Sequence, residues 1–165
     1  MLSPSSSQKN PLLGIWRLAS AIAIHSDGTV EPEIYGANPS GYITYLPSGH
    51  MMVMFSRSDR SPLSQEIRSP LSQEIRSIPV KESAEAFYTF NAYAGRYTLK
   101  GNTVIHHIEI ASIPNRVDTQ LTRTFILNGD RITLKTPPTP SDGVLKSFEL
   151  MWERMETNNG VINTN

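Results

Sequence analysis

Residues 96–111 read RYTLKGNTVIHHIEIA, two alternating stretches on either side of Gly101-Asn102. Glycine and asparagine adopt the left-handed backbone conformations that a two-residue hairpin turn requires, so this stretch predicts two antiparallel strands. Across that turn Lys100 pairs with Thr103, and paired residues share one face of a sheet. Because Lys100 and Thr103 suit solvent, we expect the other face to point inward, and it carries Tyr97, Leu99, Val104, His106, Ile108 and Ile110.

Strand-like segments separated by turn residues recur through the rest of the chain. They are residues 14–24, 42–46, 51–55, 121–127, 131–136 and 144–154. A helix is predicted over residues 83–94, between strands 3 and 4, with Gly95 ending it. The sequence therefore predicts an all-β fold of eight consecutive antiparallel strands with one helix. We favour a barrel over a sandwich, because closure removes exposed strand edges and leaves an interior wide enough for one small ligand.

The composition narrows the class of protein. The 165 residues include 15 Lys plus Arg, 15 Asp plus Glu and no cysteine. Disulfides and thiolate chemistry are therefore excluded, and binding to nucleic acid through a broad basic surface is not expected. Polar tails are predicted at residues 1–10 and 157–165, around one domain at 11–156. No apolar run suits a signal peptide or a membrane span, so we expect a cytoplasmic monomer or homodimer with no membrane partner.

An octapeptide is repeated between the third strand and the helix. Residues 60–67 read RSPLSQEI, and residues 68–75 read RSPLSQEI again. A single short repeat does not indicate a solenoid, and lengthening a loop in this way costs only about 0.6 kcal/mol per doubling. We expect a mobile loop over residues 60–80. It is either a tolerated duplication or a lid over the barrel mouth.

The same pairing argument sorts the other strands. Across Asn128-Gly129 it predicts that Phe125 faces Ile132 and that Arg123 faces Leu134, with all four side chains inside. The turn Pro47-Ser48-Gly49 pairs Tyr45 with Met51 and Ile43 with Val53, which places Phe55 inward as well. In the last segment one face carries Phe148, Leu150, Trp152 and Arg154.

The predicted interior is apolar except for His106, Tyr97, Tyr45 and Arg123, a composition typical of a small-molecule site. A desolvated histidine stays neutral and can exchange a proton, a tyrosine can donate to an oxyanion, and an arginine can hold an enolate or carboxylate. We therefore assign candidate catalytic roles to His106, Tyr97 and Arg123. Candidate substrate-binding residues are Tyr45, Met51, Val53, Phe55, Ile108, Phe125, Phe148 and Trp152. No metal or cofactor is predicted, since no motif for either is present.

Several segments together resemble the lipocalin-like family of bacteria and fungi. They include Leu12–Leu18 with its Gly-x-Trp opening, Gly41–Tyr45, Gly49–Val53, Gly95–Thr98, Thr103–Glu109, Pro114-Asn115 and Trp152–Arg154. The resemblance implies an up-and-down eight-stranded barrel with an internal cavity. It also implies that Arg154 packs over the ring of Trp16 in a cation–π contact. Some fungal relatives act in natural-product pathways as cofactor-free cyclases or isomerases.

Three functions remain open at this point. The first is a cofactor-independent cyclase or isomerase that uses acid/base catalysis on a hydrophobic, carbonyl-containing intermediate of polyketide or terpenoid type. The second is a non-catalytic carrier of a small hydrophobic ligand. The third is a protein-interaction module whose interior is filled by side chains. His106 and Tyr97 can also be a structural pair of the core, and Arg123 can be a structural ion-pair partner.

Overall fold

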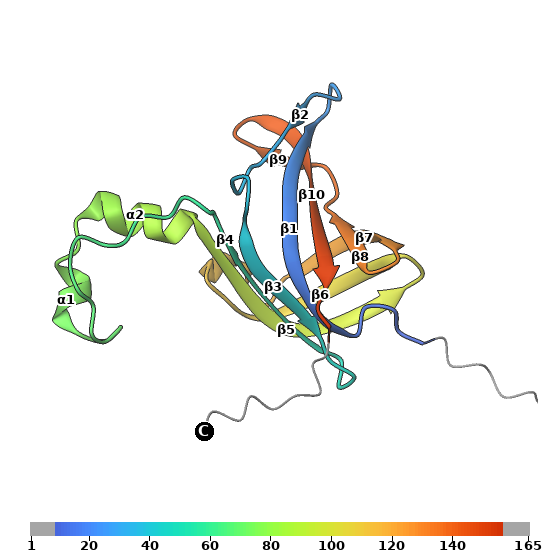
Figure 1. The fold of residues 1–165 in the computed structure, drawn as a ribbon, viewed down its shortest axis with the longest axis horizontal. Helices are drawn as coiled ribbons and strands as arrows, with labels where there is room; N and C mark the ends of the chain where they lie inside the picture. The colour runs from blue at the N-terminus through green and yellow to red at the C-terminus, as the bar shows by residue number, and fades with distance from the viewer. Residues whose placement is uncertain (1–8, 157–165) are drawn as a thin grey trace, which may run out of the picture.

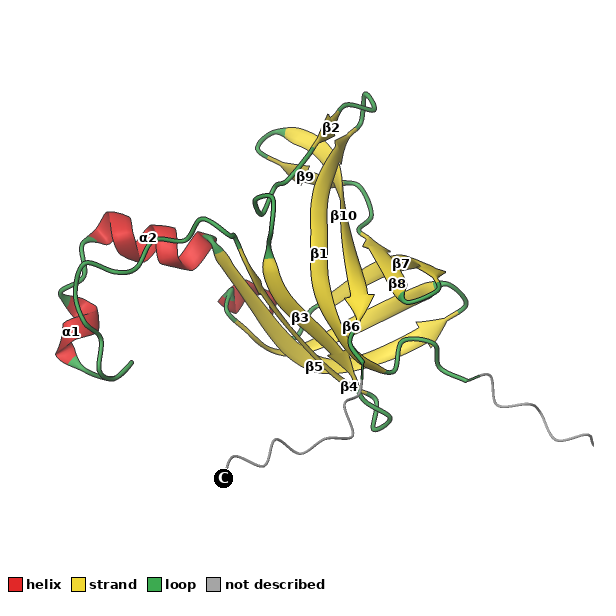
Figure 2. Ribbon diagram, in the orientation of Figure 1, coloured by secondary structure: helices red, strands yellow, loops and turns green. Residues whose placement is uncertain are grey.

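In a computed structural model that describes residues 9–156, eight long antiparallel strands form a closed barrel (Figures 1 and 2). Each strand pairs with the next one along the barrel, and the first and last long strands pair with each other to close it. The long strands are β1 (Gly14–His25), β3 (Ser40–Tyr45), β4 (His50–Ser56), β5 (Phe90–Lys100), β6 (Thr103–Ala111), β7 (Gln120–Asn128), β8 (Arg131–Lys135) and β10 (Val144–Arg154). Two short strands, β2 (Val30–Glu31) and β9 (Thr139–Ser141), extend β1 and β10 at one end.

Two of the three predicted hairpin registers are confirmed. Across Gly101-Asn102, Tyr97 lies opposite His106 and Lys100 opposite Thr103. The turn before β4 sets Tyr45 opposite Met51, as expected. The inward face predicted for each hairpin follows from these registers, since paired residues point to the same side of the sheet.

The third predicted register is wrong, because the turn lies one residue further along the chain than predicted. Asn128 pairs with Arg131, so the turn is Gly129-Asp130, and Phe125 lies opposite Leu134 instead of Ile132. Gly129 has φ +60° and takes the first turn position, as Gly101 does with φ +59°. A turn of this kind requires glycine at its first central position, and that requirement decides the register. The shift preserves the face, so Phe125, Ile132 and Leu134 are all buried.

The predicted helix is shorter than expected and begins earlier. Helix α2 spans Val80–Tyr88, and β5 begins at Phe90 and pairs with β4. The short helix α1 (Gln73–Arg76) precedes it. Residues 90–94 have helix-compatible spacing, but pairing with a neighbouring strand decides their conformation. Gly95 therefore ends no helix: it lies within β5, where its backbone passes directly against the His107 carbonyl of β6.

A bulge in β6 changes the outcome for one predicted core residue. Ala94 pairs with Ile110 and Gly95 with Ile108, which leaves Glu109 as an extra residue on β6. An extra residue reverses the inward and outward alternation beyond it. Ile108 is buried as predicted, whereas Ile110 points outward and is 66% exposed.

The N-terminal segment closes one end of the barrel. The guanidinium of Arg154 lies 4.0 Å from the centre of the Trp16 ring, which confirms the expected cation–π contact. Arg154 also donates hydrogen bonds to the carbonyls of Leu13 and Pro11, at 2.7 and 3.0 Å. The indole N–H of Trp16 donates to the Leu12 carbonyl at 2.8 Å. These contacts join the beginning and end of the domain.

The connections at the other end of the barrel surround its mouth. They are residues 26–39, 57–89, 112–119 with the short helix η1 (Pro114–Arg116), and 136–143. In Figure 1 the segment that carries α1 and α2 extends away from the barrel. It is anchored where Arg60 donates to Thr89 Oγ1 and to the Ala86 carbonyl, both at 3.2 Å. The second octapeptide copy contributes to α1, whereas the first copy is irregular.

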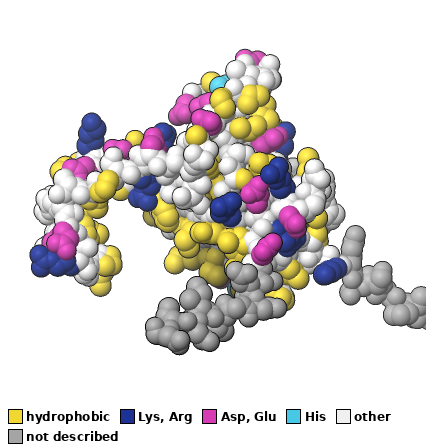
Figure 3. All heavy atoms as spheres, viewed as in Figure 1, with side chains coloured by type: hydrophobic (Ala, Val, Ile, Leu, Met, Phe, Trp, Pro, Cys, Tyr) yellow, Lys and Arg dark blue, Asp and Glu magenta, His cyan; other side chains and the backbone are white. Residues whose placement is uncertain are grey.

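Apolar side chains also gather on the outer surface near β3, β4 and β5 (Figure 3). Tyr42, Met52 and Met54 are each about half exposed there. The described helices include none that is both long enough and apolar enough to cross a membrane.

Candidate functional site

A cavity of about 340 Å³ occupies the mouth half of the barrel. Its lining residues come from the strands and from the loops around the mouth. They are Tyr35, Ile43, Val53, Phe55, Asn91, Tyr93, Arg116, Arg123, Leu134, Thr136, Thr139, Pro140, Ser141, Phe148, Leu150 and Trp152. A cavity of this volume is at the lower end of the range seen for small-molecule sites, roughly 300–1,000 Å³.

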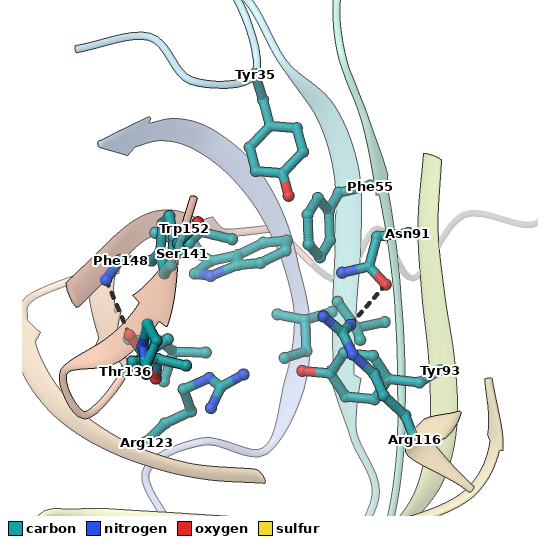
Figure 4. A pocket seen from close by; sticks show the side chains of 16 residues that line it. Tyr35, Phe55, Asn91, Tyr93, Arg116, Arg123, Thr136, Ser141, Phe148 and Trp152 are labelled. Carbon is teal, nitrogen blue, oxygen red and sulfur yellow. Dashed lines mark hydrogen bonds between the residues drawn. The ribbon is translucent and has the colours of Figure 1, made fainter. Parts of the chain in front are cut away.

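Aromatic rings form a large part of the wall. The ring of Tyr35 meets Phe55 edge to face at 4.9 Å, and Phe55 meets Trp152 at 6.2 Å. Figure 4 shows Tyr35 reaching in from the mouth with its hydroxyl directed into the cavity. Rings held in this way give an apolar surface with a fixed orientation, which is typical of the lining of a small-molecule site.

The polar part of the wall is mostly basic and hydroxylic. Arg123 projects from β7, and Arg116 projects from η1 and donates to Asn91 Oδ1 at 3.0 Å (Figure 4). The Tyr93 hydroxyl lies between the two guanidiniums in that view. Burial raises the pKa of Tyr93, although the charges of Arg123 and Arg116 act in the opposite direction.

The predicted site residues divide into two groups. Arg123, Val53, Phe55, Phe148 and Trp152 line the cavity. The others, apart from the partly buried Tyr97, are packed in the barrel beside it: Tyr45, Met51 and His106 have no exposed surface, and Ile108 and Phe125 are buried. The structure thus brings together five of the predicted residues at the cavity wall.

His106 is enclosed by two tyrosines and does not line the cavity. Its Nε2 lies 2.8 Å from the Tyr45 hydroxyl, and its Nδ1 lies 3.2 Å from the Tyr93 hydroxyl. Burial, assisted by the positive charges of Arg123 and His107, lowers the pKa of His106 from 6.5 to about 3. The imidazole is therefore neutral at physiological pH, and Tyr93 separates it from the cavity.

Tyr97 lies opposite His106 in the sheet, but its hydroxyl turns toward the closed end of the barrel. It donates to the Leu46 carbonyl at 2.9 Å and accepts from Asn10 Nδ2 at 2.7 Å. The ring packs edge-on against Tyr45 at 5.0 Å. Desolvation raises the pKa of Tyr97. This hydroxyl joins the N-terminal segment to the barrel and is not at the cavity wall.

Seven polar lining residues were not predicted as site residues: Tyr35, Asn91, Tyr93, Arg116, Thr136, Thr139 and Ser141. Tyr93 and Asn91 fall in the segment predicted as a helix, and that prediction gives them no strand face. Tyr93 is two residues before Gly95 and four before Tyr97, and extending the β5 alternation backwards predicts its inward face. Arg116 and Tyr35 lie in loops, where alternation gives no signal.

The residues that the structure describes include no group of three or more His, Asp or Glu placed to hold a metal ion. The site instead offers hydrogen-bond donors around an apolar hollow. Such a site can orient a hydrophobic molecule by its oxygen atoms, and it can stabilise negative charge on them.

A comparison with protein families agrees with this architecture. The model of a family described as a lipocalin-like domain matches residues 13–155. No curated protein matches the chain in sequence. Among solved structures, an uncharacterized protein from Bacteroides eggerthii DSM 20697 is similar with 13% identity and a TM-score of 0.43, over 87% of this chain and 99% of that one. The REP1-NXSQ fatty acid transporter is similar with 10% identity and a TM-score of 0.39, over 89% of this chain and 98% of the transporter.

Proposed function

Since the chain belongs to the family of lipocalin-like domains, we propose that it binds a small hydrophobic molecule in the barrel cavity. The observation that carries this proposal is the cavity of about 340 Å³ with its wall of Phe55, Phe148, Leu150 and Trp152. Transfer of apolar surface from water into such a hollow is favourable by roughly 25 cal/mol per Å². A pure interaction module would have an interior completely filled by side chains, whereas this barrel contains a cavity.

A titration with phenylnaphthylamine, an uncharged aromatic dye that fluoresces in apolar surroundings, tests this binding. Leu150 lines the cavity, so Leu150→Trp fills the hollow with an indole. Ile126 is 70% exposed on the outside of β7, and Ile126→Trp is the matched control. We expect micromolar binding to the parent and to Ile126→Trp, and a loss of about tenfold or more in Leu150→Trp. Equal binding to all three chains contradicts the proposal.

A second candidate is a cofactor-independent cyclase or isomerase for a carbonyl-containing intermediate of polyketide or terpenoid type. The Tyr93 hydroxyl and the Arg123 guanidinium at the cavity wall support it, because both can stabilise an oxyanion that develops from a carbonyl. His106 can act in this scheme only through Tyr93, since it does not line the cavity. Tyr97 does not line the cavity, so this scheme gives it no direct contact with a guest.

The carrier and the catalyst differ in turnover. Liquid chromatography coupled to mass spectrometry, applied to a hydrophobic polyketone incubated with the protein, separates any isomer or cyclised product from the starting ketone. Catalysis predicts product formation that Arg123→Gln reduces by about a hundredfold, a size typical of losing one oxyanion donor. Arg96→Gln removes an exposed arginine paired with Glu109 and is the control. If the ketone binds and is recovered unchanged, the protein is a carrier and not a catalyst for this compound.

A further inference from the structure

The cavity wall carries two positive charges and no negative one. Arg123 and Arg116 both line it, and none of the other lining residues is Asp or Glu (Figure 4). In the described part of the chain, no carboxylate lies within 4.0 Å of either guanidinium. A guanidinium keeps its charge in any surroundings, so a partly buried pair of them favours an anionic partner.

Most of the N–H groups of Arg123 and Arg116 have no hydrogen-bond partner among residues 9–156. Arg123 donates one N–H to the Thr122 carbonyl at 2.8 Å, and Arg116 donates one to Asn91, although a guanidinium has five. The buried indole N–H of Trp152, whose ring lines the cavity, has no hydrogen-bond partner within residues 9–156. These donors favour an occupant that supplies acceptor atoms.

Tyr45 determines which nitrogen of His106 carries the proton. Its hydroxyl is completely buried, and its one hydrogen-bonding contact among the described residues is with His106 Nε2. A buried hydroxyl has to donate its proton to an acceptor. His106 Nε2 is consequently the unprotonated nitrogen, and the single N–H of the neutral imidazole is on Nδ1.

The proton on Nδ1 in turn determines the role of Tyr93. The Nδ1–H group points to the Tyr93 oxygen at 3.2 Å, so that oxygen accepts a hydrogen bond from inside the barrel wall. The Tyr93 proton is then free to point away from His106, into the cavity that this residue lines. Burial raises the pKa of Tyr93, which keeps this proton in place at neutral pH.

From this arrangement we infer that the cavity takes a hydrophobic ligand bearing an anionic oxygen, a carboxylate or an enolate, held by Arg123, Arg116 and the Tyr93 hydroxyl. His106 is a positioning residue in this site: together with Tyr45 it fixes Tyr93 as a donor. The inference rests on the proposed ligand binding and adds the chemical class of the ligand to it.

Calorimetric titration with naphthylacetic acid and with naphthylethanol tests the ligand class, because the two molecules share a ring system and differ in charge. We expect the parent protein to bind the acid about tenfold or more tightly than the alcohol. Arg123→Gln and Arg116→Gln should each lower the affinity for the acid several-fold and leave the alcohol nearly unchanged. Arg96→Gln, on the outer surface, should preserve the preference.

The possible outcomes distinguish failure of this inference from failure of the proposed hydrophobic binding. Equal affinity for acid and alcohol overturns the anionic ligand and leaves hydrophobic binding intact. A parallel loss of both ligands in Arg123→Gln overturns the assigned role of that side chain. Failure of the parent to bind acid, alcohol or phenylnaphthylamine contradicts the proposed function itself.

Nitrogen NMR of the His106 ring tests the positioning role without any mutation. The expected spectrum of the parent shows a protonated Nδ1 and an unprotonated Nε2. The reverse tautomer overturns the assignment of Tyr93 as a donor. Tyr45→Phe should release the tautomer and lower the preference for acid over alcohol, whereas a merely structural role for Tyr45 predicts lower stability with the same preference.

Discussion

His106 makes the stability of the protein depend on pH. Its pKa is about 3 in the folded protein and 6.5 when unperturbed, so the unfolded chain binds a proton more readily. Protonation therefore favours unfolding as the pH falls below about 6.5, by about 1.4 kcal/mol per pH unit. We expect the free energy of unfolding to fall by about 3 kcal/mol more in the parent than in His106→Gln between about pH 7 and pH 4.

Urea titrations across this pH range measure the effect. His50 is exposed, so His50→Gln is the control: it removes a histidine that is not buried. The control should follow the parent curve. If His106→Gln has the same pH slope as the parent, then His106 is not a buried neutral group.

The interior residues show how far alternation along a strand can predict a site. It correctly placed His106 and Arg123 inside the barrel, because side chains of one strand face in and out in turn. Alternation carries no information on depth along the barrel axis or on the reach of a side chain. For this reason it could not show that Arg123 extends to the cavity whereas His106 is covered by Tyr93.

Among the strands, the bulge between β5 and β6 depends on one glycine. A Cβ on Gly95 would collide with the backbone carbonyl of His107, and backbone atoms cannot move aside as a flexible side chain can. We expect Gly95→Ala to destabilise the fold by at least about 3 kcal/mol, which thermal or urea unfolding measures.

Gly28→Ala is the matched control. Gly28 has φ +87°, and a Cβ there meets no atom within 4 Å, so the substitution introduces conformational strain alone. It should cost about 1 kcal/mol. Equal effects of the two substitutions would show that the close backbone approach is not the reason why position 95 requires glycine.

The strand pattern predicted most of the barrel, and its failures have local causes. Both ends of β6 and β10 agree with the predicted segments, because alternation and turn residues both mark them. The beginning of β5 was missed because an alanine-rich and aromatic stretch has helical spacing as well, and only pairing with β4 decides between them. Gly95 indicates the bulge at Glu109 only if residues 90–95 belong to a strand, so a helix predicted over these residues left the outward position of Ile110 unpredicted.

The join between the two ends of the domain depends on the shape of one guanidinium. Arg154 covers Trp16 and donates to two carbonyls of the segment before β1, a geometry that a lysine cannot reproduce. Arg154→Lys should lower the free energy of unfolding by about 1–2 kcal/mol in urea titrations. Arg17 is exposed and pairs with Glu153, so Arg17→Lys should have almost no effect. If Arg154→Lys leaves the free energy of unfolding unchanged, then packing alone holds the two ends of the domain together.

In the molecule as a whole, the duplicated segment is separate from the binding cavity. No residue between positions 57 and 89 lines the cavity, and both helices of the segment extend away from the barrel. Deletion of either octapeptide copy produces the same chain, because the two copies are identical. The shortened chain keeps an arginine at the position of Arg60, so the hydrogen bond that anchors the segment to Thr89 can still form.

We therefore expect this shortened protein to keep the unfolding temperature of the parent within a few degrees and to bind phenylnaphthylamine with the same rates. Stopped-flow fluorescence measures association and release. A several-fold change in either rate would favour the lid interpretation over the tolerated duplication.

The chain has two tryptophans, and the structure gives them very different surroundings. Trp152 forms part of the cavity wall, while Trp16 is sealed beneath Arg154 with no exposed surface. A guest that enters the barrel touches the first indole and leaves the second in unchanged surroundings. The intrinsic ultraviolet emission of the protein thus contains both an indicator of occupancy and an internal reference, and screening for natural guests requires no dye at all.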